Sequence, residues 1–134
     1  MSLFVDTSVW SLAFRRDAPP AAPEVAALSR ALAGGDMVLS TGIVLQELLQ
    51  GFAGPRACDA ILQRFSALPL LIPERRDHVE AAELRNASRR AGIQIGTIDA
   101  LLAQLCIGRG VTMLTTDGDF ETIAKRFPLK LWKG

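Results

Sequence analysis

Short apolar runs alternate along the chain with longer segments in which apolar residues recur at helical spacing. Leu3-Phe4-Val5 and Met37-Val38-Leu39 are continuous apolar runs, as expected of strands that are covered on both faces. The same pattern predicts strands over 3–5, 37–40, 111–115 and 129–132, and a strand or a connector over 70–72. Pro69 and Pro73 bound the last of these segments on either side.

The segments between the predicted strands have the composition and spacing of helices. Pro23 suits a first helical turn, and Gly34-Gly35 suits a helix end. Helices are predicted over 9–16, 23–33, 43–52, 55–68, 77–91, 97–107 and 120–127. Strands that alternate with helices predict one α/β domain over residues 1–134, with a mainly parallel sheet covered by helices on both faces.

Composition narrows the class of protein further. The chain has 134 residues, of which 49% are hydrophobic, so a well-filled core is expected. It contains neither the roughly 20 consecutive apolar residues of a membrane span nor an N-terminal secretion signal, so we expect a cytoplasmic protein. Cys58 and Cys106 lie far apart, which favours reduced, buried thiols. A net charge of +1 neither requires nor excludes a nucleic acid partner.

Two acids follow predicted strands directly. Asp6 comes after the first strand, and Asp117 comes after Val111 to Thr115. Because ligands of open α/β sheets bind at the carboxyl ends of the strands, both are candidate site residues. The alternative for Asp6 is that it caps the following helix. In the second motif Asp119 is expected to cap a helix that starts at Phe120, although the two acids could share or exchange these roles.

Two further acids lie on predicted helices. Glu47 falls at the edge of an apolar stripe, where it could face a crevice, although most such glutamates are solvated. Asp99 lies in a largely apolar helix that leaves little surface for water. Its alternative role is structural, since Thr97 is a suitable N-cap and an acid in the first turn interacts favourably with the helix dipole.

Acids that share a crevice repel one another, and a hard divalent cation relieves that cost. Mg²⁺ or Mn²⁺ takes oxygen ligands and is commonly held by one or two carboxylates together with substrate phosphate. Zinc is a poor candidate, because His78 is the only histidine and the cysteines are unpaired. The chemistry that suits acids with Mg²⁺ is phosphoryl transfer.

The residues around these acids resemble the four acidic motifs of PIN-domain ribonucleases, and the length and layout are similar to the VapC toxins of toxin-antitoxin systems. The motifs are Asp6-Thr7-Ser8-Val9-Trp10, Glu47, Asp99-Ala100-Leu101-Leu102-Ala103 and Thr115-Thr116-Asp117-Gly118-Asp119-Phe120. The resemblance implies an α/β/α sandwich, a Mg²⁺-dependent endoribonuclease, a homodimer and inhibition by an antitoxin protein.

Carried over to this chain, the resemblance implies specific roles for the four acids. Asp6, Glu47, Asp99 and Asp117 would form the catalytic site. Asp6 and Asp99 would be the direct metal ligands, with Asp117 as a further ligand. The neighbouring hydroxyl groups of Thr7, Ser8 or Thr116 would orient the acids from behind.

Two alternative functions remain for a chain with these acids. A phosphatase of the haloacid dehalogenase type also carries an Asp after its first strand, but typically has a second Asp two residues later, where this chain has Ser8. A PIN-like binding module without activity is the non-enzymatic alternative, and the presence of all four acids argues against it.

The sequence also predicts two binding surfaces, one for RNA and one for an antitoxin. RNA needs a basic rim around an acidic centre, and the candidates nearest in sequence to the motifs are Arg15, Arg16, Arg109, Lys125 and Arg126. An antitoxin segment could bind an apolar groove formed by Trp10, Leu12 and Phe14, unless these side chains simply belong to the core.

Overall fold

A four-stranded parallel sheet forms the centre of the molecule. The computed structural model describes residues 1–15 and 22–134. The sheet has the order β3-β2-β1-β4, and its strands are β1 (Ser2–Val5), β2 (Met37–Thr41), β3 (Leu70–Leu71) and β4 (Thr112–Leu114). In the register, Phe4 lies between Leu39 and Met113. The predicted parallel sheet is therefore confirmed, with the first strand at its centre.

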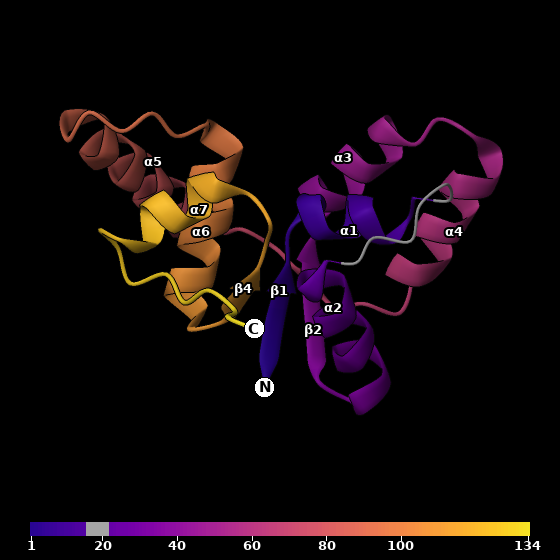
Figure 1. The fold of residues 1–134 in the computed structure, drawn as a ribbon. Coiled ribbons are helices and arrows are strands. Elements are labelled where there is room, and N and C mark those ends of the chain that lie inside the picture. Colours follow the sequence, from indigo (N-terminus) through magenta and orange to yellow (C-terminus); the bar gives the residue numbers. More distant parts are fainter. Residues whose placement is uncertain (16–21) are drawn as a thin grey trace.

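In the described part of the chain, seven helices cover the sheet in two layers. They are α1 (Thr7–Ala13), α2 (Pro23–Gly34), α3 (Gly42–Gly51), α4 (Pro55–Phe65), α5 (Arg75–Arg90), α6 (Thr97–Arg109) and α7 (Gly118–Ala124). Figure 1 shows α1 to α4 on one side of the strands and α5 to α7 on the other. Right-handed crossovers require this division, because the chain steps outward from β1 to β3 and then returns across the sheet to β4.

The core lies where the strands meet these two layers. Phe4 and Val5 of β1 and Met113 and Leu114 of β4 are fully buried. Trp10 of α1 is buried on its side of the sheet, and its ring packs 5.0 Å from that of Phe65, measured between ring centroids. Burying each such side chain stabilises the fold by roughly 1.5–3 kcal/mol. The strand ends that carry the candidate acids are therefore anchored in the buried core.

The predicted strand over 129–132 is reduced to a single bridge. Leu131 pairs in parallel with Met113, whose N–H donates to the Lys130 carbonyl at 2.8 Å, while the Trp132 N–H donates to the Met113 carbonyl at 2.9 Å. A tight turn, in which the Leu129 N–H bonds to the Phe127 carbonyl, precedes this bridge. The segment still extends the sheet beyond β4, although not as a full strand.

The two cysteines are free thiols, as predicted. Cys106 is buried, and this burial raises the pKa of its thiol to about 12. Cys58 is only partly buried, and its Sγ donates to the Phe52 carbonyl at 3.0 Å. In the part of the chain that the structure describes, no helix combines the length and the apolar character needed to span a bilayer.

Candidate active site

Asp6 and Asp117 lie at one edge of the sheet because β1 and β4 are neighbouring parallel strands. Each acid also caps the helix that follows it. Asp6 Oδ1 accepts from the Ser8 N–H at 3.0 Å at the start of α1, and Asp117 Oδ1 accepts from the Asp119 N–H at 2.9 Å at the start of α7. Capping and convergence on one site are therefore compatible here, rather than alternatives.

Hydroxyl groups tie the two strand ends together. Thr115 Oγ1 donates to Asp6 Oδ2, and Ser8 Oγ donates to the same oxygen at 2.9 Å. The Asp117 N–H donates in turn to Thr115 Oγ1 at 3.0 Å, and the Thr116 N–H donates to Ser8 Oγ at 3.0 Å. This network fixes the loop after β4 against the start of α1, and with it the relative position of Asp6 and Asp117.

The carboxyl group of Asp6 is buried, with an exposed fraction of only 5%. This burial raises the pKa of Asp6 above its ordinary value, while the hydrogen bonds from Thr115 and Ser8 oppose the rise. The negative charge of Asp117 adds to the increase. A buried acid with another acid nearby is an electrostatically costly arrangement that a cation would relieve.

Glu47 reaches the same region from α3. It is partly buried, and its Oε1 accepts a hydrogen bond of 2.7 Å from Thr7 Oγ1. Thr7 directly follows Asp6, so this bond joins the third-helix acid to the end of β1. The expectation that Glu47 faces a crevice rather than bulk solvent agrees with this position.

Asp99, in the first turn of α6, lies among the other acids. Burial, followed by the negative charges of Asp117, Asp6, Asp119 and Glu47 in that order, raises the pKa of Asp99 to about 6. Three motifs from distant parts of the chain thus act electrostatically on the carboxyl group of the fourth. The convergence expected from the sequence is present in the fold.

The tightest acidic group consists of Asp99, Asp117 and Asp119. Each offers one carboxylate oxygen, and these three oxygens lie within 4.8 Å of one another. Asp6 does not belong to this set of three. Asp119 was expected to be the cap of α7, but Asp117 has that role and the helix begins two residues earlier than predicted. Asp119 is exposed and turns toward Asp99 instead.

Sequence reasoning missed two members of this site. Thr115 was placed inside the strand, yet its hydroxyl group bonds to Asp6. Asp119 was assigned to capping, although two acids separated by one glycine in a tight turn can both face the same side. The alternative of a shared role for Asp117 and Asp119 had been left open, and it describes the structure best.

The start of α6 is held by a side chain from α5 rather than by a cap. Thr97 was a candidate N-cap, but Gly96 has that position and makes no side-chain cap bond. Arg85 Nε instead donates to the Ile95 carbonyl at 2.8 Å, directly before the helix. This bond fixes the chain that leads into Asp99.

The far end of α6 is held by an ion pair. Arg109 donates from both terminal nitrogens to the two carboxylate oxygens of Asp77, at 3.1 and 3.0 Å, and Asp77 is buried. The guanidinium of Arg109 and the Glu74 N–H lower the pKa of Asp77. Arg109 was one of the candidates for an RNA-binding rim, and in the structure its charge is paired within the fold.

The expected apolar groove on α1 is partly core. Trp10 is buried and stacks on Phe14, with ring centroids 5.9 Å apart. Phe14 is only partly buried and lines a surface hollow of about 470 Å³ together with residues of α4 and the turn that follows it. Of the two candidate rim residues that follow this helix, Arg15 is exposed, whereas Arg16 lies outside the described residues.

Comparison with known proteins identifies the family of this chain. The sequence profile of the PIN domain matches residues 3–126. Ribonuclease VapC11 of Mycobacterium tuberculosis is 30% identical over 125 residues, which is 92% of each chain. By fold, the chain is similar to VapBC2 from Rickettsia felis bound to a promoter DNA fragment, with a TM-score of 0.76, 23% identity and coverage of 99% of this chain and 100% of that one.

A second solved structure has a similar fold. The VapC20 toxin of Mycobacterium tuberculosis, described as cleaving the sarcin-ricin loop, has a TM-score of 0.67 and 22% identity, and covers 93% of this chain and 95% of that one. The likeness to both structures lies in the fold, while the sequence match to the VapC ribonuclease extends over nearly the whole length. The chain belongs to the PIN-domain family and, within it, to the VapC ribonucleases.

Proposed function

We propose that this chain, as a single PIN domain, is a metal-dependent endoribonuclease that acts as the toxin of a toxin-antitoxin pair. The observation that carries the proposal is the convergence of acids from β1, α3, α6 and the loop after β4 on one edge of the sheet. Asp99, Asp117 and Asp119 approach within 4.8 Å there, and hydroxyl groups hold Asp6 in place beside them. The related VapC11 is named a ribonuclease.

The donor set fits a hard divalent cation. All candidate ligands are carboxylate oxygens, and their mutual repulsion at Asp99 is of the kind that a bound cation removes. We assign the Mg²⁺ or Mn²⁺ ligands to Asp6, Asp99 and Asp117, with Asp119 close enough to contribute. When bound, the metal supplies a more acidic attacking water and charge stabilisation at the leaving oxygen.

The remaining residues of the site either orient the Asp6 carboxylate or accept a proton. Thr115 and Ser8 keep the Asp6 carboxylate in one orientation. Glu47 has one oxygen engaged by Thr7 at 2.7 Å, and its second oxygen is available to accept a proton from a water that attacks the phosphodiester. Asp6, Glu47, Asp99 and Asp117 together form the catalytic group.

Solved structures with a similar fold support an antitoxin as the partner of this chain. The solved structures similar to this chain include toxin-antitoxin complexes, among them FitAcB of Neisseria gonorrhoeae and DNA-bound VapBC of Salmonella typhimurium. We infer that an antitoxin covers this chain with an apolar segment at the Phe14 hollow and presents an Arg to the acids. We also propose that the chain forms a homodimer and acts in the cytoplasm.

Cleavage of a fluorogenic RNA by the purified chain tests the activity. We expect cleavage with Mg²⁺ or Mn²⁺, none in chelator, and a loss of at least about 100-fold for Asp99→Asn and Asp117→Asn. Asp59→Asn, at an exposed position on α4, is the control and should cleave normally. RNA binding without cleavage by the unmodified chain would support an inactive module, and hydrolysis of a phosphomonoester instead would support the phosphatase reading.

A further inference from the structure

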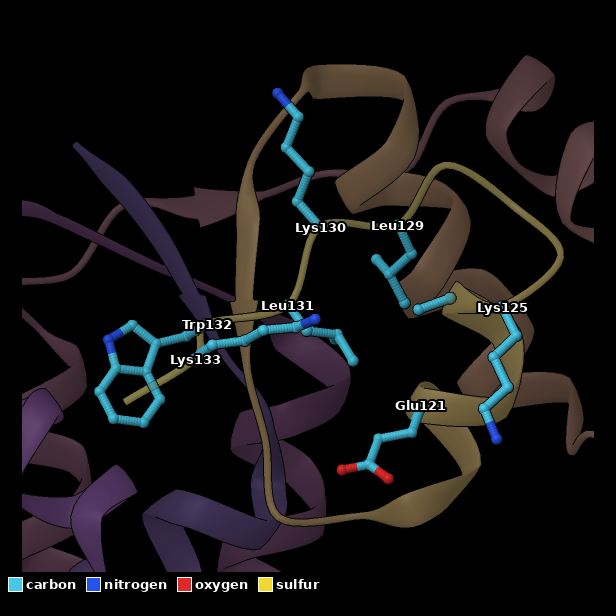
Figure 2. Close-up of a pocket in the computed structure, with 8 residues that line it drawn as sticks. Glu121, Lys125, Leu129, Lys130, Leu131, Trp132 and Lys133 are labelled. Carbon is cyan, nitrogen blue, oxygen red and sulfur yellow. The ribbon is translucent and has the colours of Figure 1, made fainter.

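A groove of about 590 Å³ runs between α7 and the segment that follows it. Its lining consists of Glu121, Ala124, Lys125, Leu129, Lys130, Leu131, Trp132 and Lys133. Figure 2 shows Leu129 and Leu131 at the middle of the groove, with Lys125 on the α7 side and Lys133 on the opposite side. The indole of Trp132 and the amine of Lys130 extend outward, to its rim.

Positive charge dominates this groove. Lys125, Lys130 and Lys133 are exposed, and Glu121 is the single acid in its lining. Within residues 1–15 and 22–134, these three lysines form no ion pair with any acid. Lysines that are not neutralised by the protein itself are available to an anionic ligand.

The groove begins beside the acidic centre. Glu121, one of its lining residues, lies on α7 one turn after Asp117, which caps the start of that helix in the acidic centre. Lys125 follows the other end of α7, roughly 12 Å from Asp117 along the helix axis. Lys133 lies across the groove from α7, two residues beyond the Leu131 bridge to Met113.

We propose that this groove is a binding subsite for the RNA strand as it leaves the acidic centre. Backbone phosphates contact Lys125 and Lys133 on the two sides of the groove, while a sugar or base lies over Leu129 and Leu131. This inference rests on the proposed ribonuclease function, because the occupant is the same RNA that the acids cleave. It adds a specific path for the strand and assigns Lys133 and Lys130, which were not among the expected rim residues.

Charge and shape favour single-stranded RNA over other anions. A flexible strand can bend from the acids into a groove beside them, and such strands bind through basic grooves that follow the backbone. The apolar floor gives a sugar or base a surface that a free phosphate would not use. Glu121 lies at the end of the groove nearest to Asp119, where it repels the strand and limits its affinity.

Fluorescence anisotropy with a labelled ten-nucleotide single strand tests the subsite. It is measured in the cleavage-deficient Asp99→Asn background, with Lys125→Gln, Lys133→Gln and Glu121→Gln added singly. We expect each lysine change to weaken binding about three- to tenfold and to reduce the slope of log K against log salt by about 0.7. Glu121→Gln should tighten binding and make it more salt-dependent.

The lysine changes should weaken RNA binding, whereas Glu121→Gln should tighten it. These opposite effects separate a specific subsite from general electrostatic attraction of RNA. Arg90→Gln, which removes an exposed charge at the end of α5, is the matched control and should change the affinity less than twofold. An equal loss for Arg90→Gln, or unchanged affinity for both lysine variants, would overturn the subsite. The ribonuclease proposal is judged separately, since it fails only if the unmodified chain does not cleave RNA.

Discussion

The hydroxyl group of Thr7 donates a 2.7 Å hydrogen bond to Glu47, forty positions away in the chain. Thr7→Val should leave one oxygen of Glu47 without this partner and free its side chain to turn toward solvent. We expect RNA cleavage to fall about tenfold, with a cost of about 1 kcal/mol in the free energy of unfolding. Thr7→Ser keeps the hydroxyl group and should retain most activity. Equal cleavage by both variants would show that this bond does not position Glu47.

Repulsion among the acids should be visible as a stability effect. Without metal, Asp99→Asn removes one of the charges, so its melting temperature should equal or exceed that of the unmodified chain. Mg²⁺ at a hundredfold excess over its dissociation constant should stabilise the unmodified chain by about 2.7 kcal/mol. That corresponds to a rise of roughly 8–14 °C for a domain of this size. The Asn variant should gain much less, and a thermal scan with and without chelator measures both.

The same carboxyl group should make the metal-free protein sensitive to pH. The pKa of Asp99 is about 6 when folded and has its ordinary value when unfolded, so between these values the folded chain binds more protons. The free energy of unfolding therefore falls as pH rises from about 4 to about 6. In chelator, melting at pH 5 should exceed that at pH 7, and Asp99→Asn should flatten this difference.

The lowered pKa of Asp77 does not interfere with that comparison. Its stabilising contribution is present above the ordinary pKa of an aspartate and is lost only as pH falls below it. At pH 5 and above it is constant. A pH profile that stays equally steep in Asp99→Asn would instead assign the effect to another group.

Arg109 should matter for stability and hardly at all for RNA binding. Arg109→Ala leaves the buried Asp77 carboxylate without its bidentate partner, and we expect a loss of about 3 kcal/mol in denaturant unfolding. The double variant Arg109→Ala with Asp77→Ala should be less damaged than the single change, since no buried charge is then left unpaired. Weaker RNA affinity in a still-folded Arg109→Ala protein would restore this residue to the basic rim.

The sheet and the convergence of acids could be predicted because they depend on chain order. A continuous apolar run such as Leu3-Phe4-Val5 predicts a buried strand, and acids after parallel neighbouring strands must leave at the same edge. Asp6 and Asp117 therefore needed no contact information to be brought together. The same holds for the division of helices between two faces, which follows from crossover handedness.

Side-chain pairing could not be predicted in this way. Arg109 resembles any solvated cation in the sequence, because nothing there reveals that Asp77 lies opposite it, 32 positions earlier. The exchange of roles between Asp117 and Asp119 depends on a helix start that shifted by two residues, and local capping preferences allow either acid. Thr115 acquired its role only through a bond to Asp6, 109 positions away.

The position of β1 between β2 and β4 has a consequence for the timing of synthesis. The ribosome adds Asp6 109 positions before its partner Thr115, and the acids of the last motif follow Thr115. At ordinary elongation rates this delay is on the order of ten seconds. Until Thr115 and the last motif have left the ribosome, a nascent chain therefore has no assembled acidic centre.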